Sequence, residues 1–186
     1  MAGGNGNDTY VVNNITKSFV EIEDTGGTDN LQIKGVNVND LLFFFDVVVN
    51  ENTEYGYADD GLYIIHRNFP DSVISQMKKF MSDPNNINNV PQAGAVCIEY
   101  YFGNTNNLQQ NGKYGTNYGN KHIENISAVN SAGVKYTYDI KSYVSAVRPK
   151  VLDFLKKNGY NTAVDVMFSG NAELIKNCKT YTKALP

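Results

Sequence analysis

Short apolar runs separated by Gly, Asn and Asp dominate the first third of the chain, a pattern typical of strands joined by tight turns. The runs at residues 11–12, 19–22 and 31–33 predict three successive short strands. Residues 41–49 form a longer apolar run, interrupted by Asp46, that predicts a segment buried on both faces. Because an exposed segment of this kind would aggregate, it must pack against a helix or a second sheet.

The middle of the chain predicts strands and one helix. Apolar residues between 73 and 81 recur at helical spacing, and Asp83-Pro84 ends that segment. A strand at residues 73–74 is the alternative. Residues 95–102 predict a strand, and the polar stretch 104–120 predicts a surface loop. Residues 123–129 and 134–140 predict two strands joined by a four-residue turn.

The last part of the chain predicts helices. Apolar residues from Val144 to Leu155 recur at helical spacing, and Gly159 is placed to cap the helix. Pro149 predicts either a kink or the first turn of this helix. Short helices are predicted over residues 162–168 and 172–178.

Residues 3–11 read GGNGNDTYV, which fits the nonapeptide G-G-x-G-x-D-x-U-x, where U is a large apolar residue. The glycines permit a tight turn with positive φ and leave carbonyl oxygens pointing inward. Asp8 adds a hard anionic oxygen, which suits Ca²⁺. Tyr10, in the eighth place, starts a short strand that faces the core.

A second copy of the pattern follows at residues 24–32, which read DTGGTDNLQ. Leu31 takes the eighth place of the frame, and the first two glycines are lost. The 21-residue offset is close to the about 18 residues of one parallel β-roll coil, so the two turns should stack with a cation between them. The predicted calcium ligands are Gly4, Gly6, Asp8, Gly27 and Asp29. Ordinary metal-free turns are the alternative.

Only remnants of the repeat are recognisable further on. Asp40 with Leu42, and Asp60 with Leu62, keep the spacing of the sixth and eighth places. The simpler interpretation of Asp40, Asp59 and Asp60 is that they are solvated carboxylates in turns.

These motifs resemble the C-terminal end of a repeats-in-toxin (RTX) protein, of the haemolysin-type calcium-binding family. Later segments also resemble that family, namely residues 39–43, 60–65, 71–80 and 122–133. The resemblance implies export by type I secretion through an uncleaved C-terminal signal, followed by calcium-driven folding outside the cell. The hydroxyl-rich tail, residues 180–186, suits such a signal.

The predicted fold is mainly β with α, in three parts. Residues 1–66 should be the degenerate end of a truncated parallel β-roll. Residues 67–140 should form a β-rich capping region with antiparallel strands. Residues 141–186 should form a small helical segment carrying the secretion signal. Because Met1-Ala2 leads directly into a repeat, we expect this chain to be part of a longer protein.

The predicted function is non-enzymatic: a calcium-dependent folding and type I secretion module of a secreted or cell-surface protein. Its partners would be the type I secretion machinery and a host or cell surface. A calcium-stiffened adhesin or surface-layer domain is the alternative, and Tyr114 and Tyr118 could then stack on sugar rings. A third interpretation is a calcium-triggered module that cuts itself at Asp83-Pro84.

Charge and cysteine content exclude several other functions. The net charge of −3, without a basic stripe, argues against nucleic-acid binding. The longest apolar run is too short to span a bilayer, and the N-terminus lacks the features of a cleaved signal peptide. Cys97 and Cys178 fit neither a disulfide scaffold nor a zinc site. Cys97 and His122 could be a nucleophile and its base, but a buried cysteine and a surface histidine are the simpler interpretation.

Overall fold

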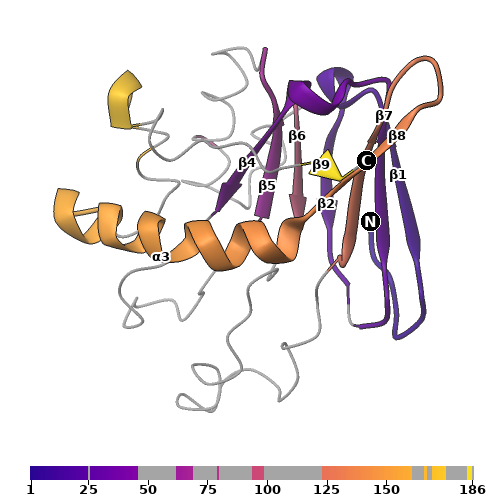
Figure 1. Ribbon diagram of the computed structural model, residues 1–186, viewed down its shortest axis with the longest axis horizontal. Helices are drawn as coiled ribbons and strands as arrows, with labels where there is room; N and C mark the ends of the chain where they lie inside the picture. Colours follow the sequence, from indigo (N-terminus) through magenta and orange to yellow (C-terminus); the bar gives the residue numbers. More distant parts are fainter. Residues whose placement is uncertain are drawn as a thin grey trace.

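The computed structural model describes residues 1–24, 26–45, 62–68, 79, 94–98, 123–160, 166, 169–174 and 184–185. These residues form two mixed sheets and one long helix (Figure 1). The five-stranded sheet has the order β1-β3-β7-β8-β9, and the four-stranded sheet has the order β2-β6-β5-β4. The strands are β1 (Thr9–Asn13), β2 (Phe19–Ile22), β3 (Asn30–Lys34), β4 (Leu41–Phe45), β5 (Leu62–His66), β6 (Ala95–Ile98), β7 (Asn125–Val129), β8 (Lys135–Tyr138) and β9 (Ala184–Leu185).

The chain coils between the two sheets. It runs from β1 in the five-stranded sheet through the 3₁₀ turn η1 (Ile15–Lys17) to β2 in the other sheet. It then returns to β3, which pairs parallel with β1. The same step occurs again later, because β6 pairs parallel with β2 and β7 pairs parallel with β3. The parallel strands expected of a β-roll are therefore present.

The N-terminal residues add the beginning of one further rung. Ala2 forms a parallel bridge with Glu23, and the backbone N–H of Gly3 donates to the Glu23 carbonyl at 3.0 Å. The first three residues therefore lie along β2, on the edge opposite β6. The turn before β1 consequently stacks on the turn between β2 and β3.

The strands β4 and β5 lie between β3 and β6 in the sequence and pair antiparallel. β4 pairs antiparallel with β5, and β5 pairs antiparallel with β6, all in the four-stranded sheet. The assignments of Asp40 with Leu42 and of Asp60 with Leu62 to further repeats are therefore wrong, since Leu42 and Leu62 lie on antiparallel strands. Asp40 instead ends the 3₁₀ turn η2 (Val38–Asp40), where its carboxylate accepts from the Asn37 backbone at 3.0 Å.

The predicted hairpin is confirmed. β7 and β8 pair antiparallel, and the Gly133 N–H donates to the Asn130 carbonyl at 2.9 Å across the turn. The second strand ends at Tyr138, because Asp139 caps the helix that follows by accepting from the Ser142 N–H at 3.1 Å.

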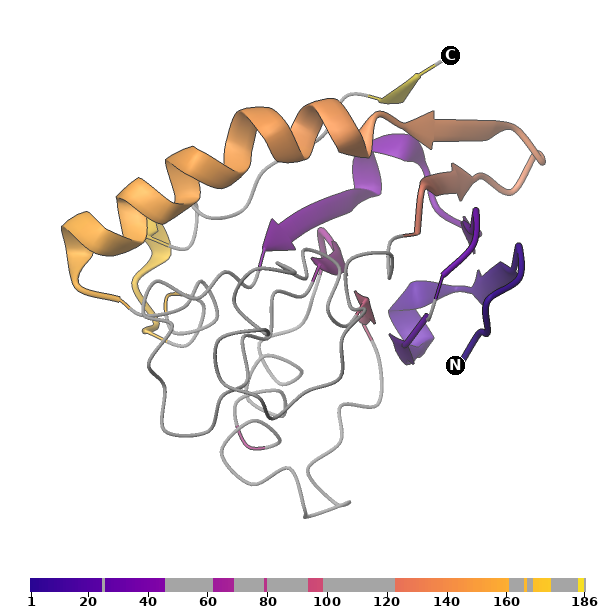
Figure 2. The same cartoon turned by 90° about the horizontal axis from the view of Figure 1, so that it is seen from below.

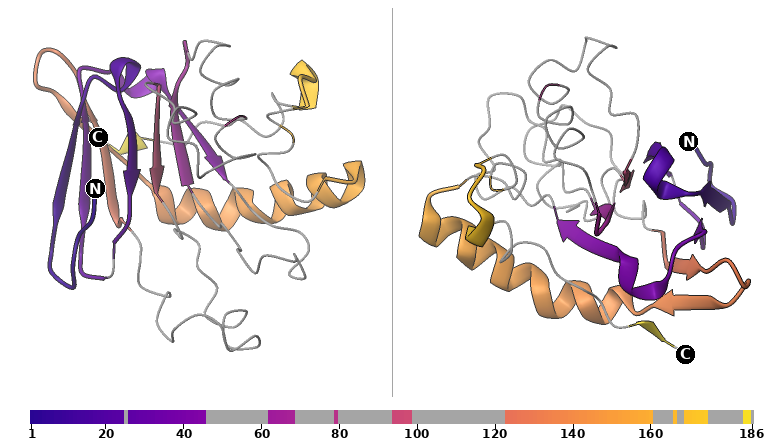
Figure 3. Two further views of the ribbon diagram at one scale, coloured as in Figure 1. Left: turned by 180° about the vertical axis from the view of Figure 1, so that it is seen from behind. Right: turned by 90° about the horizontal axis from the view of Figure 1, so that it is seen from above.

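The helix α3 (Ile140–Asn158) begins one residue before the predicted helical part, residues 141–186, and contains Pro149 in its interior. Gly159 caps it with a φ of 73°, as predicted. The helix lies alongside β4, whereas β1 lies at the far side of the molecule (Figures 2 and 3). The Tyr143 hydroxyl donates to the Phe43 carbonyl at 3.4 Å, and Val151 and Leu155 are buried in the core. The helix therefore covers apolar surface that β4 would otherwise expose.

One hydrophobic cluster joins both sheets and α3. The predicted class, mainly β with α, is confirmed, and the division into three parts stays a prediction. Of the predicted helix over residues 73–81, only Lys79 is described, in helical conformation. In the described part of the chain, no helix combines the length and apolar character needed to cross a membrane.

Candidate metal centre

The acidic residues of the repeat lie where the parallel strands of the five-stranded sheet begin. Asp8 immediately precedes β1, Asp29 precedes β3, and Glu124 precedes β7. The register pairs Thr9 with Asn30 and Asn30 with Asn125. The three acids therefore occupy the same position on three adjacent strands.

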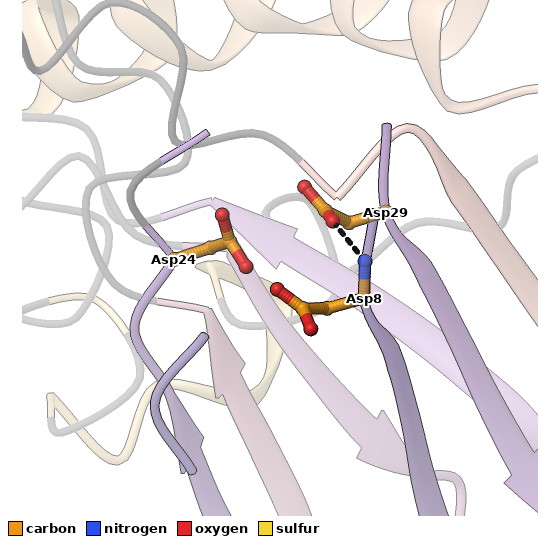
Figure 4. Close-up of side chains that lie close together, drawn as sticks. All are labelled: Asp8, Asp24 and Asp29. Carbon is orange, nitrogen blue, oxygen red and sulfur yellow. Dashed lines mark hydrogen bonds between the residues drawn. The ribbon is translucent and has the colours of Figure 1, made fainter. Parts of the chain in front are cut away.

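Three carboxylates converge at this place. Asp8, Asp24 and Asp29 each offer an oxygen, and these oxygens lie within 4.8 Å of one another. Figure 4 shows the three side chains reaching toward a common space from three separate backbone segments. Asp24 and Asp29 are fully buried, and Asp8 is partly buried. The predicted approach of the first and second turns is therefore present, with Asp24 added.

Asp24 is held by two hydrogen bonds. Its Oδ1 accepts from the backbone N–H of Gly26 at 2.7 Å, and its Oδ2 accepts from the Tyr10 hydroxyl. Burial, this hydrogen bond and the surrounding carboxylates raise the pKa of Tyr10 far above its ordinary value. The Tyr10 hydroxyl therefore stays protonated, and its hydrogen bond to Asp24 holds that carboxylate in place.

Asp29 carries a buried oxygen that has no hydrogen-bond partner. Its Oδ1 accepts from the backbone N–H of Asp8 at 2.7 Å, whereas its Oδ2 is buried without a hydrogen-bond partner. Burial is the main reason that the pKa of Asp29 lies above its ordinary value, and the charges of Asp24, Glu124 and Asp8 add to the rise. Buried polar atoms in native proteins are nearly always partnered, so this oxygen is a candidate ligand for a cation.

The glycines of the two turns differ in what they do. A Cβ on Gly3 would collide with the Tyr10 hydroxyl and Asp24 Oδ2 and would lie 2.9 Å from Asp8 Oδ2. A Cβ on Gly27 would collide with the carbonyl of Gly6, which shows how closely the two turns stack. By contrast, a Cβ on Gly4 or Gly6 would meet nothing within 4 Å.

The expected positive φ is found in the second turn and not in the first. Gly26 and Gly27 have φ values of 139° and 151°. None of the glycines between residues 3 and 6 has a positive φ. The first turn is therefore tight for a different reason: Gly3 leaves room for the side chains of the site. Metal ligation by Gly4, Gly6 and Gly27 stays a prediction.

An all-oxygen site with three acidic side chains suits a hard divalent cation. Carboxylate and carbonyl oxygens are the ligands of Ca²⁺, Mg²⁺ and Mn²⁺, whereas softer metals prefer nitrogen and sulfur. A cation would partner Asp29 Oδ2 and offset the mutual repulsion of the carboxylates. The residues present therefore fit the metal that the repeat implies.

Sequence reasoning missed two residues of this region. Asp24 stands in the place of the first glycine of the second nonapeptide, so the pattern does not predict it as a ligand. Glu124 and Ile126 keep the spacing of the sixth and eighth places, as Asp8 and Tyr10 do, but Glu124 lies 95 residues beyond Asp29. The signal in the sequence that could have identified Glu124 was an acidic residue two positions before an apolar strand residue.

Several other predicted features are not part of this centre. Cys97 is buried on β6, as the simpler interpretation required. The remaining predictions lie outside the described residues; they concern Asp59, Asp60, Asp83-Pro84, Tyr114, Tyr118, His122 and Cys178.

The chain matches no known family model, no curated protein and no solved structure. The resemblance to repeats-in-toxin proteins therefore depends on the motif residues themselves.

Replacing Gly3 with Ala should disturb the site, because its Cβ would displace the Tyr10 hydroxyl and the Asp24 carboxylate. Overpacking of this kind typically costs about 1–3 kcal/mol of unfolding free energy. Gly4→Ala is the matched control, and it should change stability by less than about 0.5 kcal/mol, as surface substitutions usually do. Urea denaturation measures both values. Equal stability of the two variants would contradict the packing described here.

The metal-free protein should lose stability as the pH rises through the raised pKa of Asp29. The folded chain holds the Asp29 proton more tightly than the unfolded chain does, so this group favours folding at low pH. That contribution disappears as Asp29 ionises in the folded state. Melting temperatures in a chelator, measured across the acidic range for wild type and Asp29→Asn, isolate the effect. Wild type should fall relative to the variant with rising pH; a relative rise would contradict the assigned direction.

Proposed function

We propose that this chain is a calcium-stabilised folding module of an exported protein of the repeats-in-toxin type. The observation that carries the proposal is the buried, unpartnered Oδ2 of Asp29 beside Asp8 and Asp24. Two of these three carboxylates are fully buried. Burial of several acids in one place is unfavourable unless a proton or a cation compensates their charge.

A cation explains more of the geometry than a proton does. A proton on Asp29 would lower the charge, but it would leave the carboxylates of Asp8 and Asp24 facing each other. A divalent cation attracts all three, and an ionised carboxylate retains lone pairs beyond the hydrogen bonds it already accepts.

Calcium fits this centre better than magnesium. Ca²⁺ accepts six to eight oxygen ligands in flexible geometry, including backbone carbonyls. Mg²⁺ demands near-ideal octahedral geometry and usually keeps several of its waters. Two glycine-rich turns stacked on each other offer many carbonyls in a pliable arrangement, which favours the larger ion.

The mechanism that follows is metal-coupled folding. Without calcium, repulsion among the carboxylates opposes the stacking of the two turns, and the glycines keep high conformational entropy. With calcium, stacking of the turns fixes the register of β1 against β3. Calcium is scarce in the cytoplasm and reaches millimolar levels outside the cell, where even weak sites fill. The chain would thus remain pliable before export and fold afterwards.

The C-terminus would connect this mechanism to export. β9 pairs with β8 at the edge of the five-stranded sheet, and α3 is buried along one face. A secretion signal within residues 141–186 would therefore be partly covered in the folded protein. Export machinery would have access to it only before the chain folds, which is the state that low calcium favours.

Calcium should raise the melting temperature of the chain. A ligand present at a hundredfold excess over its Kd stabilises the folded state by about 2.7 kcal/mol. At this chain length, that corresponds to roughly 5–10 °C. Thermal melts followed by circular dichroism, in EGTA and in millimolar CaCl₂, measure the difference. Identical curves in the two solutions would refute the proposal.

Variants locate the site responsible for this shift. Asp8→Asn, Asp24→Asn and Asp29→Asn should each remove most of the calcium-induced rise, because each deletes one charged ligand. Asp153→Asn is the matched control, since Asp153 is exposed on α3. If Asp153→Asn loses as much of the rise as the other three, calcium acts elsewhere and the assignment fails.

The C-terminal residues should direct export. Residues 141–186 fused behind a slow-folding reporter should be secreted by a cognate type I system. A chain lacking these residues should stay inside the cell. Immunoblots of medium and cells compare the two. Secretion of the truncated chain at the wild-type level would contradict the signal assignment without affecting the calcium proposal.

A further inference from the structure

A repeated hydrogen-bond pattern links the three acids at the starts of β1, β3 and β7. The backbone N–H of Asp8 donates to Asp29 Oδ1 at 2.7 Å. The backbone N–H of Asp29 donates in the same way to Glu124 Oε2 at 2.7 Å. Asp29 and Glu124 therefore each accept the N–H of the acid on the preceding strand.

Backbone bonds run beside this pattern in the opposite direction. The N–H of Asn30 donates to the Asp8 carbonyl at 2.9 Å, and the N–H of Asn125 donates to the Asp29 carbonyl at 3.1 Å. Side-chain and backbone hydrogen bonds together hold Asp29 to the starts of both neighbouring strands, β1 and β7. The Glu124 side chain thus reaches back over 95 residues of sequence to hold the residue that carries the unpartnered oxygen.

We propose that Glu124 is a positioning residue for the cation site. This inference rests on the proposed calcium site and extends it to a residue outside the three-carboxylate cluster. Glu124 holds the backbone of Asp29, which fixes the direction of the Asp29 carboxylate. It also adds negative charge next to the site. Groups that orient metal ligands in this way typically contribute 10–100-fold to metal affinity.

The arrangement also couples calcium to the docking of β7. If docked Glu124 strengthens cation binding, then by thermodynamic linkage a bound cation strengthens the docking of Glu124 by the same factor. β7 continues through the hairpin into β8 and α3. Calcium bound between the first two turns would thus also hold the later part of the chain in place.

A purely structural role makes a different prediction. If Glu124 only supports the start of β7, its loss should weaken the fold equally with and without calcium. If it positions Asp29, its loss should weaken calcium binding itself. The difference between these outcomes separates the two roles.

The test is calcium titration calorimetry on the full chain and its variants. Glu124→Gln keeps an acceptor oxygen for the Asp29 N–H and loses the charge, whereas Glu124→Ala loses both. Glu124→Ala should raise the Kd by about 10–100-fold, and Glu124→Gln should raise it less. Glu173→Gln, at an exposed residue on the C-terminal segment, should leave the Kd unchanged.

Hydrogen exchange supplies the second readout. In the wild type, calcium should slow exchange of the backbone amides of residues 125–129, and this response should shrink in Glu124→Gln. Should Glu124→Ala fail to fold, the Kd and exchange of Glu124→Gln decide the matter. Wild-type Kd and wild-type calcium response in the Glu124 variants would overturn this inference alone. Absence of calcium binding by the wild type would instead overturn the proposed function.

Discussion

Charge repulsion between neighbouring carboxylates opposes the parallel strand register on which this fold depends. Pairing of β1 with β3 brings Asp8 and Asp29 together, and Asp24 joins them from the end of β2. Two like charges about 4 Å apart repel by about 4 kcal/mol at an effective dielectric constant of about 20. That is a large fraction of the 5–15 kcal/mol by which a domain is typically stable. Compensation of these charges by a proton or a cation would therefore stabilise the register substantially.

The rest of the fold supports this centre from a distance. The parallel rungs are interrupted after β3, where the chain adds β4 and β5 before β6 and β7 resume the parallel order. Apolar packing of α3 against β4 covers one of the inserted strands. Because β7 returns in register, Glu124 reaches Asp29 despite the long insertion. The carboxylate cluster and the long-range topology are thus two consequences of one strand register.

Local patterns predicted the local part of this arrangement. The nonapeptide frame and its 21-residue offset identified Asp8 and Asp29, because stacking of successive coils depends on nearby residues. The same frame wrongly predicts a further repeat at Asp40. An Asp two residues before an apolar strand residue gives the same sequence spacing in parallel and antiparallel strands. Glu124 could not be predicted as part of this region, because its role depends on which distant strand pairs with β3. Asp24 could not be predicted from the nonapeptide, because it stands where the pattern has a glycine.

The central claim is that a hard cation binds among Asp8, Asp24 and Asp29, and terbium luminescence tests it most directly. Tb³⁺ binds oxygen ligands much as Ca²⁺ does, and it emits when a nearby tyrosine transfers excitation to it. Tyr10 donates its hydroxyl hydrogen bond to Asp24 within the site. Adding Tb³⁺ should therefore produce emission that excess Ca²⁺ removes, that Tyr10→Phe abolishes and that Tyr136→Phe preserves. Absence of emission, or emission unchanged in both Tyr10→Phe and Asp29→Asn, would contradict the account.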